Sequence, residues 1–349
     1  MLPNKLGTCC QILDANGKQL ANTVIGTVQQ KTLDTLLSGE CLKNSPEKRS
    51  SLLCTNLTGV KKCRDKVTDK VKQNLSALLL QLKHISRMPD DCKMFRISSN
   101  LLPVFDHPQY NMLYDDKLKT LVAYGLKLCK RVISEHNIIV SAHPDHFVKI
   151  DSDNEQVRLK SYAVLEYHRH FLEQLTTAEQ SCINIHVTGK LDHLPELDQG
   201  YYTELRKWLS FENDSVIPRA GVLGTLDFCQ RYNIKMVYDL HHDFCEHTGT
   251  HAALNDDRIM ASIINTWQGQ TPIFHVSDTK PEELERINVI SERDLLWLPI
   301  VERKPDYSLT SPAKLNPHSD YINSPNVIIR VRELLEIANI DIEAKEKNR

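Results

Sequence analysis

Short runs of apolar residues, rich in β-branched and aromatic side chains, recur along the chain and alternate with longer stretches of helical periodicity. The runs predict strands at residues 5–12, 94–97, 138–140, 183–187, 208–211, 234–238, 272–276 and 340–342. The stretches between them predict helices at residues 117–136, 156–177, 218–232, 256–268 and 327–338. Strands that alternate with helices form βα units and a parallel sheet. Eight such strands favour an α/β fold, a TIM-type (β/α)8 barrel with residues 1–349 as a single domain.

A doubly wound parallel sheet is the alternative fold, but no G-x-G-x-x-G follows the first strand and no G-x-x-x-x-G-K-[ST] occurs. Residues 31–69 interrupt the alternation because they are polar and carry few apolar side chains, so we expect an insertion or a loosely packed excursion there. An amphipathic helix follows, since apolar residues recur at helical spacing at Val67, Val71, Leu75, Leu78 and Leu82.

Composition narrows the class of protein only moderately. The chain has 43 Lys and Arg residues against 45 Asp and Glu residues, a balance that neither indicates nor excludes a nucleic-acid-binding groove. No apolar stretch approaches the roughly 20 residues of a membrane span, and the N-terminus does not resemble a signal peptide. We therefore expect an intracellular protein that does not associate with a membrane. It would lie in the cytoplasm or nucleoid, or in the nucleus of a eukaryote. The ten cysteines lack C-x-x-C spacing, which argues against a zinc ribbon and favours reduced thiols.

Potential metal ligands lie at the carboxyl ends of the predicted strands. Six of them follow or close successive strands: His143, His186, Glu212, Asp239, His275 and Glu343. Two more, His242 and His318, lie in loops that would cover the same face of a barrel. Mixed imidazole and carboxylate ligands without thiolates suit catalytic Mn²⁺, Zn²⁺ or Fe²⁺, and a shared carboxylate can hold two ions. Such a cluster polarises a phosphate, which is what phosphodiester hydrolysis requires.

Several segments also resemble, in the same order along the chain, the motifs of the UV damage endonucleases, a family related to endonuclease IV. They are FRISSNLLPVFDHP at 95–108, SAHPDHFV at 141–148, INIHVTG at 183–189, FEND at 211–214, YDLHH at 238–242, HVSD at 275–278, HSDYI at 318–322 and DIEAKEK at 341–347. The resemblance implies a DNA repair endonuclease that cuts 5′ of UV photoproducts in double-stranded DNA and leaves a 3′-hydroxyl. Abasic sites are a further expected lesion, and we expect a monomer.

The resemblance also implies which residues hold the metal, usually Mn²⁺, with Zn²⁺ or another divalent ion as the alternative. Three positions follow: His143, His186 and Glu212 for the first, Glu212, Asp239, His275 and Glu343 for the second, and His242 and His318 for the third. Glu212 is thus expected to be catalytic as a bridging ligand. Lys345 is the second expected catalytic residue because it would neutralise a phosphate, although a solvated charge run explains it equally well.

A further set of residues is expected to contact DNA or probe the lesion: His146, Phe147, Thr8, His107 and Arg96. Family members carry Gln followed by Tyr or Phe where this chain has His146 and Phe147, and an inserted aromatic stacks on a base for about 1–3 kcal/mol. The alternative for Phe147 is a buried loop anchor, for His107 a turn cap, and for Arg96 a salt bridge inside the barrel.

Besides His146, the chain departs from the family pattern at four positions near the expected substrate. Thr8 replaces a tyrosine, Ile273 replaces a lysine two residues before a ligand histidine, Lys190 replaces a glycine, and Asp145 replaces the glycine of the probing loop. Two rival functions remain open. One is a metal-dependent sugar isomerase or epimerase of the xylose-isomerase type, and the other is a protein that recognises damaged DNA without cutting it.

Overall fold

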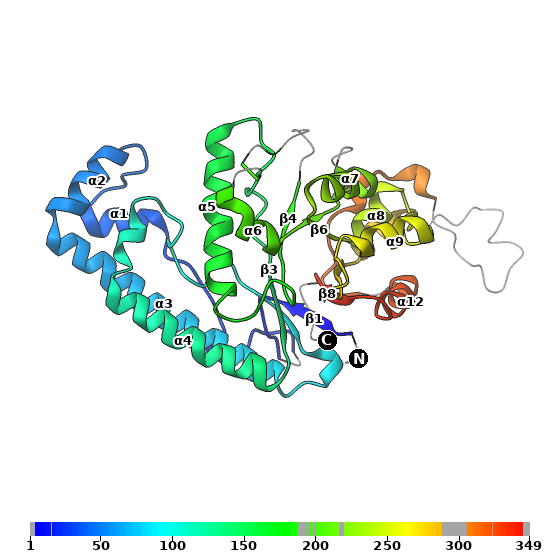
Figure 1. Cartoon of the computed structure of the whole chain (residues 1–349), viewed down its shortest axis with the longest axis horizontal. Coiled ribbons are helices and arrows are strands. Elements are labelled where there is room, and N and C mark those ends of the chain that lie inside the picture. Colours follow the sequence, from blue (N-terminus) through cyan, green and yellow to red (C-terminus); the bar gives the residue numbers. More distant parts are fainter. Residues whose placement is uncertain are drawn as a thin grey trace, which may run out of the picture.

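The strands form one parallel sheet that curls into a barrel. The computed structural model describes residues 4–344 apart from 15, 188–193, 195, 198–199, 216–219, 288–305 and 323. Eight strands lie in the spatial order β6-β5-β4-β3-β2-β1-β8-β7. They are β1 (Leu6–Cys9), β2 (Met94–Ile97), β3 (Ile139–Ala142), β4 (Ile183–His186), β5 (Leu209–Glu212), β6 (Lys235–Val237), β7 (Ile273–Val276) and β8 (Asn339–Ile342). The predicted α/β barrel is therefore confirmed (Figure 1).

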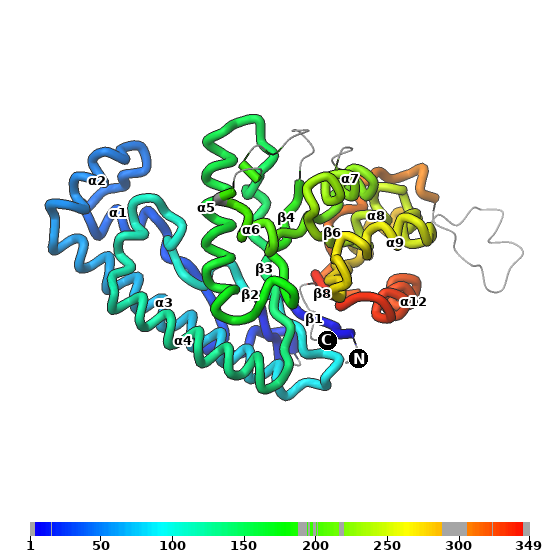
Figure 2. The backbone as a smooth tube through the Cα atoms, in the orientation of Figure 1, coloured from blue at the N-terminus to red at the C-terminus, as the bar shows by residue number. Residues whose placement is uncertain are grey.

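Closure of the barrel occurs at two places. Strand β1 pairs with both β2 and β8, so that the first and last strands of the chain lie side by side (Figure 2). On the other side, β6 and β7 meet through a parallel bridge between Asp239 and His275, and the His275 amide donates to the carbonyl of Tyr238 at 2.9 Å. The doubly wound alternative is wrong because an open sheet would leave these two edges apart.

Helices surround the sheet in the expected alternation. They are α1 (Gln30–Ser38), α2 (Pro46–Thr55), α3 (Leu57–Ile85), α4 (Asp116–Glu135), α5 (Glu155–Leu172), α6 (Thr203–Trp208), α7 (Val222–Tyr232), α8 (Leu240–Glu246), α9 (Asp257–Asn265), α10 (Pro281–Ile287), α11 (Pro312–Leu315) and α12 (Pro325–Leu334). Side-chain caps set several starts: Asp115 accepts from the amide of Leu118 at 3.0 Å before α4, and Asn154 accepts from that of Gln156 at 2.9 Å before α5. None of the helices within the described residues is long and apolar enough to cross a membrane.

The polar segment 31–69 is helical and packed, so the expectation of a loose excursion was wrong. It forms most of α1, all of α2 and the first turns of α3, which lie together at one end of the molecule (Figure 1). Their apolar side chains Leu33, Leu37, Leu53 and Val60 are all buried. Helix α3 begins ten residues before the predicted start, at Leu57, because the side chain of Asn56 accepts from the amide of Gly59 at 2.9 Å.

A buried ion pair fastens this helical segment. Asp34 of α1 accepts from Nε of Arg49 in α2 at 2.8 Å and from the Tyr110 hydroxyl at 2.7 Å through Oδ1. Its other oxygen, Oδ2, accepts from the amide of Leu42 at 3.0 Å and from Nη2 of Arg49 at 3.2 Å. The remaining guanidinium nitrogen of Arg49 donates to Gln109 at 2.8 Å. Charged residues thus complete the interior where the sequence offers few apolar ones.

Candidate active site at the barrel mouth

Strand register carries the predicted ligands to one end of the barrel. His186 and Glu212 are register partners at the ends of β4 and β5, and partners on adjacent parallel strands point to the same side of the sheet. His143 follows β3 directly, and Glu343 follows β8. His275 lies within β7 and contributes a fully buried imidazole. All of these side chains therefore meet at the carboxyl end of the barrel, where TIM-barrel active sites form.

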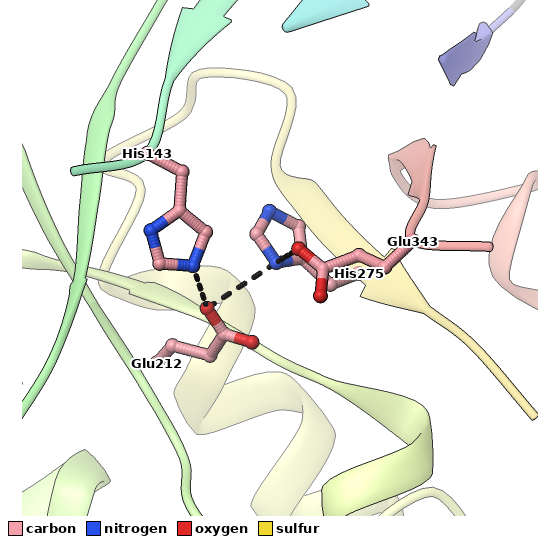
Figure 3. A group of neighbouring side chains, drawn as sticks. All are labelled: His143, Glu212, His275 and Glu343. Atoms are coloured by element: carbon pink, nitrogen blue, oxygen red, sulfur yellow. Dashed lines mark ion pairs between the residues drawn. The ribbon is translucent and has the colours of Figure 1, made fainter. Parts of the chain in front are cut away.

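Four side chains form a first group that could hold an ion (Figure 3). Oε2 of Glu212 lies 3.2 Å from Nε2 of His143 and 3.2 Å from Nδ1 of His275. The same nitrogen of His275 lies 3.0 Å from Oε1 of Glu343. One ligand atom from each of the four residues falls within 4.8 Å of the others.

Glu212 also belongs to a second group, with His186 and His242. Its Oε2 lies 3.8 Å from Nε2 of His186, and its Oε1 lies 3.9 Å from Nδ1 of His242. Nδ1 of His242 is also 2.7 Å from the carbonyl of Asn213, which leaves Nε2 as the nitrogen with a free lone pair in the neutral ring. The carboxylate of Glu212 thus lies between two sets of imidazoles.

Asp239 and His318 lie at the edge of these groups. Asp239 accepts from the amide of His242 at 2.7 Å through Oδ1, whereas Nδ1 of His318 is 3.8 Å from Oε2 of Glu343. The ligand atom of His143 groups with those of His275 and Glu343, although its ring is also 5.2 Å from that of His186. The assignment of residues to individual ions stays a prediction.

Two side chains that were not predicted as ligands hold the ligands in place. Asn184, two residues before His186 on β4, donates to Glu212, and Arg96 pairs with Glu343. Nε of Arg96 also lies 3.3 Å from Asp341, so the structure shows the interior salt bridge that was the alternative for this arginine. Strand alternation could have identified Asn184 and Asp341, because each lies two residues before a predicted ligand and on the same face of its strand.

Burial and mutual repulsion shift the pKa values of the cavity groups. Burial, with the negative charges of Glu212 and Glu343, raises the pKa of Asp239 to about 7 against the opposing effect of His242. Burial opposes ionisation of Glu212 and Glu343 as well, but His275 holds the pKa of Glu212 well below the ordinary value, and Arg96, followed by His275, does the same for Glu343. Burial lowers the pKa of His186 to about 4, which keeps this imidazole neutral and able to bind a cation.

The donor set fits divalent metal ions. Among the described residues, Oε1 of Glu212, Oδ2 of Asp239 and Nδ1 of His186 are buried without a hydrogen-bond partner. Buried polar atoms are normally paired, and several unpaired ones converging from different strands indicate that a ligand completes them. Imidazoles and carboxylates without thiolates are the donors that Mn²⁺ and Zn²⁺ accept.

Two hollows lie at this end of the barrel, and the loop after His143 separates them. A cavity of about 460 Å³ is lined by five of the candidate ligands, with Pro144, Asp145 and His146 of the loop also on its wall; the five are His143, His186, His242, His318 and Glu343. A larger groove of about 1000 Å³ lies beyond, and Asp145 and Phe147 line it. Phe147 is 64% exposed, so the alternative of a buried loop anchor is wrong.

The other residues expected to contact DNA are more scattered. His107 lines the larger groove, and its Nδ1 accepts from the amides of Gln109 and Tyr110 at 3.1 Å each, so it caps a turn as the alternative proposed. Thr8 is buried on β1 inside the barrel and does not line either hollow.

Ile273, which stands where the family has a lysine, packs in a buried apolar cluster that includes Met94. Lys190 and Lys345 lie outside the described residues.

Comparisons with known proteins agree with the geometry. Residues 41–349 match the family described as UV-endonuclease UvdE. The UV DNA damage endonuclease of Bacillus cereus (strain B4264) is 25% identical over 251 residues, which cover 68% of this chain and 74% of that protein. That of Bacillus anthracis (strain A0248) is 26% identical over 231 residues, covering 63% and 68%. The crystal structure of SacUVDE has the same fold, with a TM-score of 0.65 at 20% identity over 99% of this chain and 94% of the other. The resemblance predicted from the motifs is confirmed.

Proposed function

The chain belongs to the UV-endonuclease UvdE family, and from this premise we propose that it hydrolyses the phosphodiester 5′ of UV photoproducts in double-stranded DNA. The observation that carries the proposal is the position of Glu212, buried between two groups of imidazoles and carboxylates at the barrel mouth. A shared carboxylate of this kind is how two-metal hydrolases hold their ions close together. We also propose that the enzyme acts inside the cell as a monomer.

Each residue of the cavity has a proposed part. His143, Glu212, His275 and Glu343 would hold one divalent ion, and His186, Glu212 and His242 a second. His242 and His318, whose rings are 5.8 Å apart, would border a third ion. Asp239 would contribute its unpaired Oδ2 to the same metal centre. Bound Mn²⁺, or Zn²⁺ in its place, supplies Lewis acidity toward the phosphate and lowers the pKa of water.

The chain itself positions these ligands and receives the substrate. Asn184 and Arg96 fix the carboxylates of Glu212 and Glu343 through hydrogen bonds, so that neither side chain has to reorient during the reaction. Phe147, exposed on the loop between the two hollows, would enter the duplex at the lesion. A photodimer stacks poorly, so displacing it from the duplex costs less than displacing intact bases. Lys345 remains the proposed partner of a phosphate.

The decisive experiment compares two end-labelled duplexes, one with a single photodimer and one undamaged, with Mn²⁺ or EDTA. We expect a Mn²⁺-dependent nick directly 5′ of the dimer, leaving a 3′-hydroxyl, and no nick in EDTA. A duplex with one abasic site tests the wider lesion range. Tight binding without a nick would favour the damage-recognition protein, and neither nick nor binding would favour the sugar isomerase, which a sugar-turnover assay would test.

The same assay tests the role of Phe147. We expect Phe147→Ala to weaken the preference for the damaged duplex by about 1–3 kcal/mol, the value of one base–aromatic stack. The Mn²⁺ requirement should be unchanged. An unaltered preference for damaged DNA would contradict a wedge at this position.

A further inference from the structure

Two consecutive residues of the loop after β3 line different hollows. His146 lines the 460 Å³ cavity of candidate metal ligands, whereas Phe147 lines the 1000 Å³ groove on the other side. The two side chains therefore have different surroundings, and a shared role in probing the lesion does not follow from their adjacency in the sequence. The surroundings of His146 are imidazoles and carboxylates.

The ring of His146 continues the spacing of the other imidazoles in the cavity. Its centroid is 5.0 Å from that of His186 and 6.4 Å from that of His143. The rings of the candidate ligands are separated by similar distances: 5.2 Å for His143 and His186, 5.6 Å for His143 and His275, and 5.6 Å for His186 and His242. Two of these pairs, His143 with His275 and His186 with His242, each belong to one ligand group, so an imidazole at this spacing can bind the same ion as its neighbour.

The second group of ligands has room for one more donor. Together, His186, Glu212 and His242 supply three ligand residues, whereas the first group has four. Nε2 is the nitrogen of His186 that faces this group, 3.8 Å from Oε2 of Glu212, whereas its Nδ1 lies 3.9 Å from Oδ2 of Asp214 on the other side of the ring. His146 is exposed at the mouth of the cavity, so it lies on the side from which an ion enters.

We propose that His146 is a metal ligand, the fourth protein donor to the ion held by His186, Glu212 and His242. This inference rests on the proposed metal centre and assigns a residue to it that the strand-end pattern does not include. The loop would then be anchored to the metal centre through His146, and this anchor would hold the neighbouring Phe147 over the groove.

Metal binding without DNA tests the inference directly. Metal-free protein is titrated calorimetrically with Mn²⁺ and with Zn²⁺, for the wild type, His146→Ala, His146→Gln and Phe147→Ala. We expect His146→Ala to weaken one class of sites at least about 10-fold, since even outer-shell partners of ligands change metal affinity by 10–100-fold. His146→Gln keeps the polarity and the reach but lacks the ring nitrogen. It should lose more affinity for Zn²⁺, which favours imidazole, than for Mn²⁺, which accepts an amide oxygen.

Phe147→Ala is the matched control because it truncates the adjacent residue of the same loop. It should bind both metals as the wild type does, and thermal melts of the metal-free proteins should show that all variants are folded. Unchanged affinity in a folded His146→Ala protein would overturn the inference and leave the metal centre intact. Equal losses in His146→Ala and Phe147→Ala would overturn it too, because loop order rather than a ligand would be responsible. A wild type that binds neither metal would instead overturn the proposed metal centre, and this inference with it.

Discussion

Two clusters of buried charges in this molecule have opposite hydrogen-bonding states. In the helical segment, both carboxylate oxygens of Asp34 are paired, with Arg49, Tyr110 and the amide of Leu42. At the barrel mouth, one oxygen of Glu212 is buried without a hydrogen-bond partner within the described residues. Both clusters exclude water from charged side chains, but only the first is complete on its own.

The difference separates a structural cluster from a functional one. Leaving a buried polar group unpaired costs about 1–3 kcal/mol, and more for a charged group. A chain selected for stability alone would pair such atoms, as it does around Asp34. The unpaired atoms at the mouth therefore indicate a partner that is not part of the chain.

Replacing Glu212 should abolish the reaction and leave the fold intact. We expect Glu212→Gln to reduce nicking of damaged DNA by about 10⁴-fold or more, the scale of losing a central catalytic group. Single-turnover nicking assays and circular dichroism measure the two quantities. The matched control is Glu196→Gln, because Glu196 is also a buried glutamate with one paired oxygen, which accepts from Arg158 at 2.8 Å, but it does not line the cavity. Substantial nicking by folded Glu212→Gln protein would contradict the assignment.

Replacing Arg49 should have the reverse effect. Arg49→Leu leaves the carboxylate of Asp34 buried without its counter-charge, although Tyr110 and the amide of Leu42 still donate to it, and breaking a buried ion pair typically costs about 3–5 kcal/mol of stability. Urea unfolding measures this loss, and nicking per folded molecule should match the wild type. Adding Asp34→Asn to Arg49→Leu should recover part of the loss. Full stability in the single variant would show that the ion pair does not hold the helical segment.

Metal removal should affect only the cluster at the mouth. At free Mn²⁺ 100-fold above its dissociation constant, binding to the folded state adds about 2.7 kcal/mol to the free energy of unfolding. We expect EDTA to remove this gain in the wild type and in the Arg49→Leu variant. The Glu212→Gln protein should gain little free energy of unfolding from Mn²⁺. A gain equal to that of the wild type would contradict the proposal that two ions share Glu212.

Mild acid should affect the cluster around Asp34. Burial alone would raise the pKa of Asp34, but hydrogen bonds from Arg49 and Tyr110 outweigh it and hold the pKa below its ordinary value. Because the folded pKa is depressed, this contribution to stability is complete above the unfolded pKa of about 3.9 and is lost as the pH falls below it. Urea unfolding between pH 6 and 3 should show a smaller decline for Asp34→Asn than for the wild type. An equal decline in the free energy of unfolding of both proteins would show that ionisation of Asp34 does not contribute to stability.

The sequence predicted the barrel and the residues of its mouth because both depend on local patterns. A ligand such as Glu212 comes directly after an apolar run, and the ends of parallel strands meet at one face whatever the details of the packing. The packing of residues 31–69 was missed because its interior includes Asp34 and Arg49, and a count of apolar positions treats such residues as exposed. The charge pair joins positions 15 residues apart, which no helical periodicity reveals.

The grouping of the ligands was also beyond the sequence. The family resemblance implied that His143 and His186 hold the same ion. Inside a barrel, side chains from strands that are not adjacent also meet, so His143 of β3 shares Glu212 with His275 of β7. The surroundings of His146 and Phe147 could not be predicted for a related reason, since loop residues follow no period that assigns them to a face.

The bridge between β6 and β7 has a consequence for local opening of the barrel. It joins Asp239 to His275, two residues of the candidate metal centre, and the amide of His275 donates across it. An ion shared by Glu212 of β5 and His275 of β7 would span the short strand β6 and hold this junction closed. Hydrogen exchange at the His275 amide should therefore slow when Mn²⁺ binds, so that a single backbone proton reports on both the occupancy of the site and the integrity of the barrel.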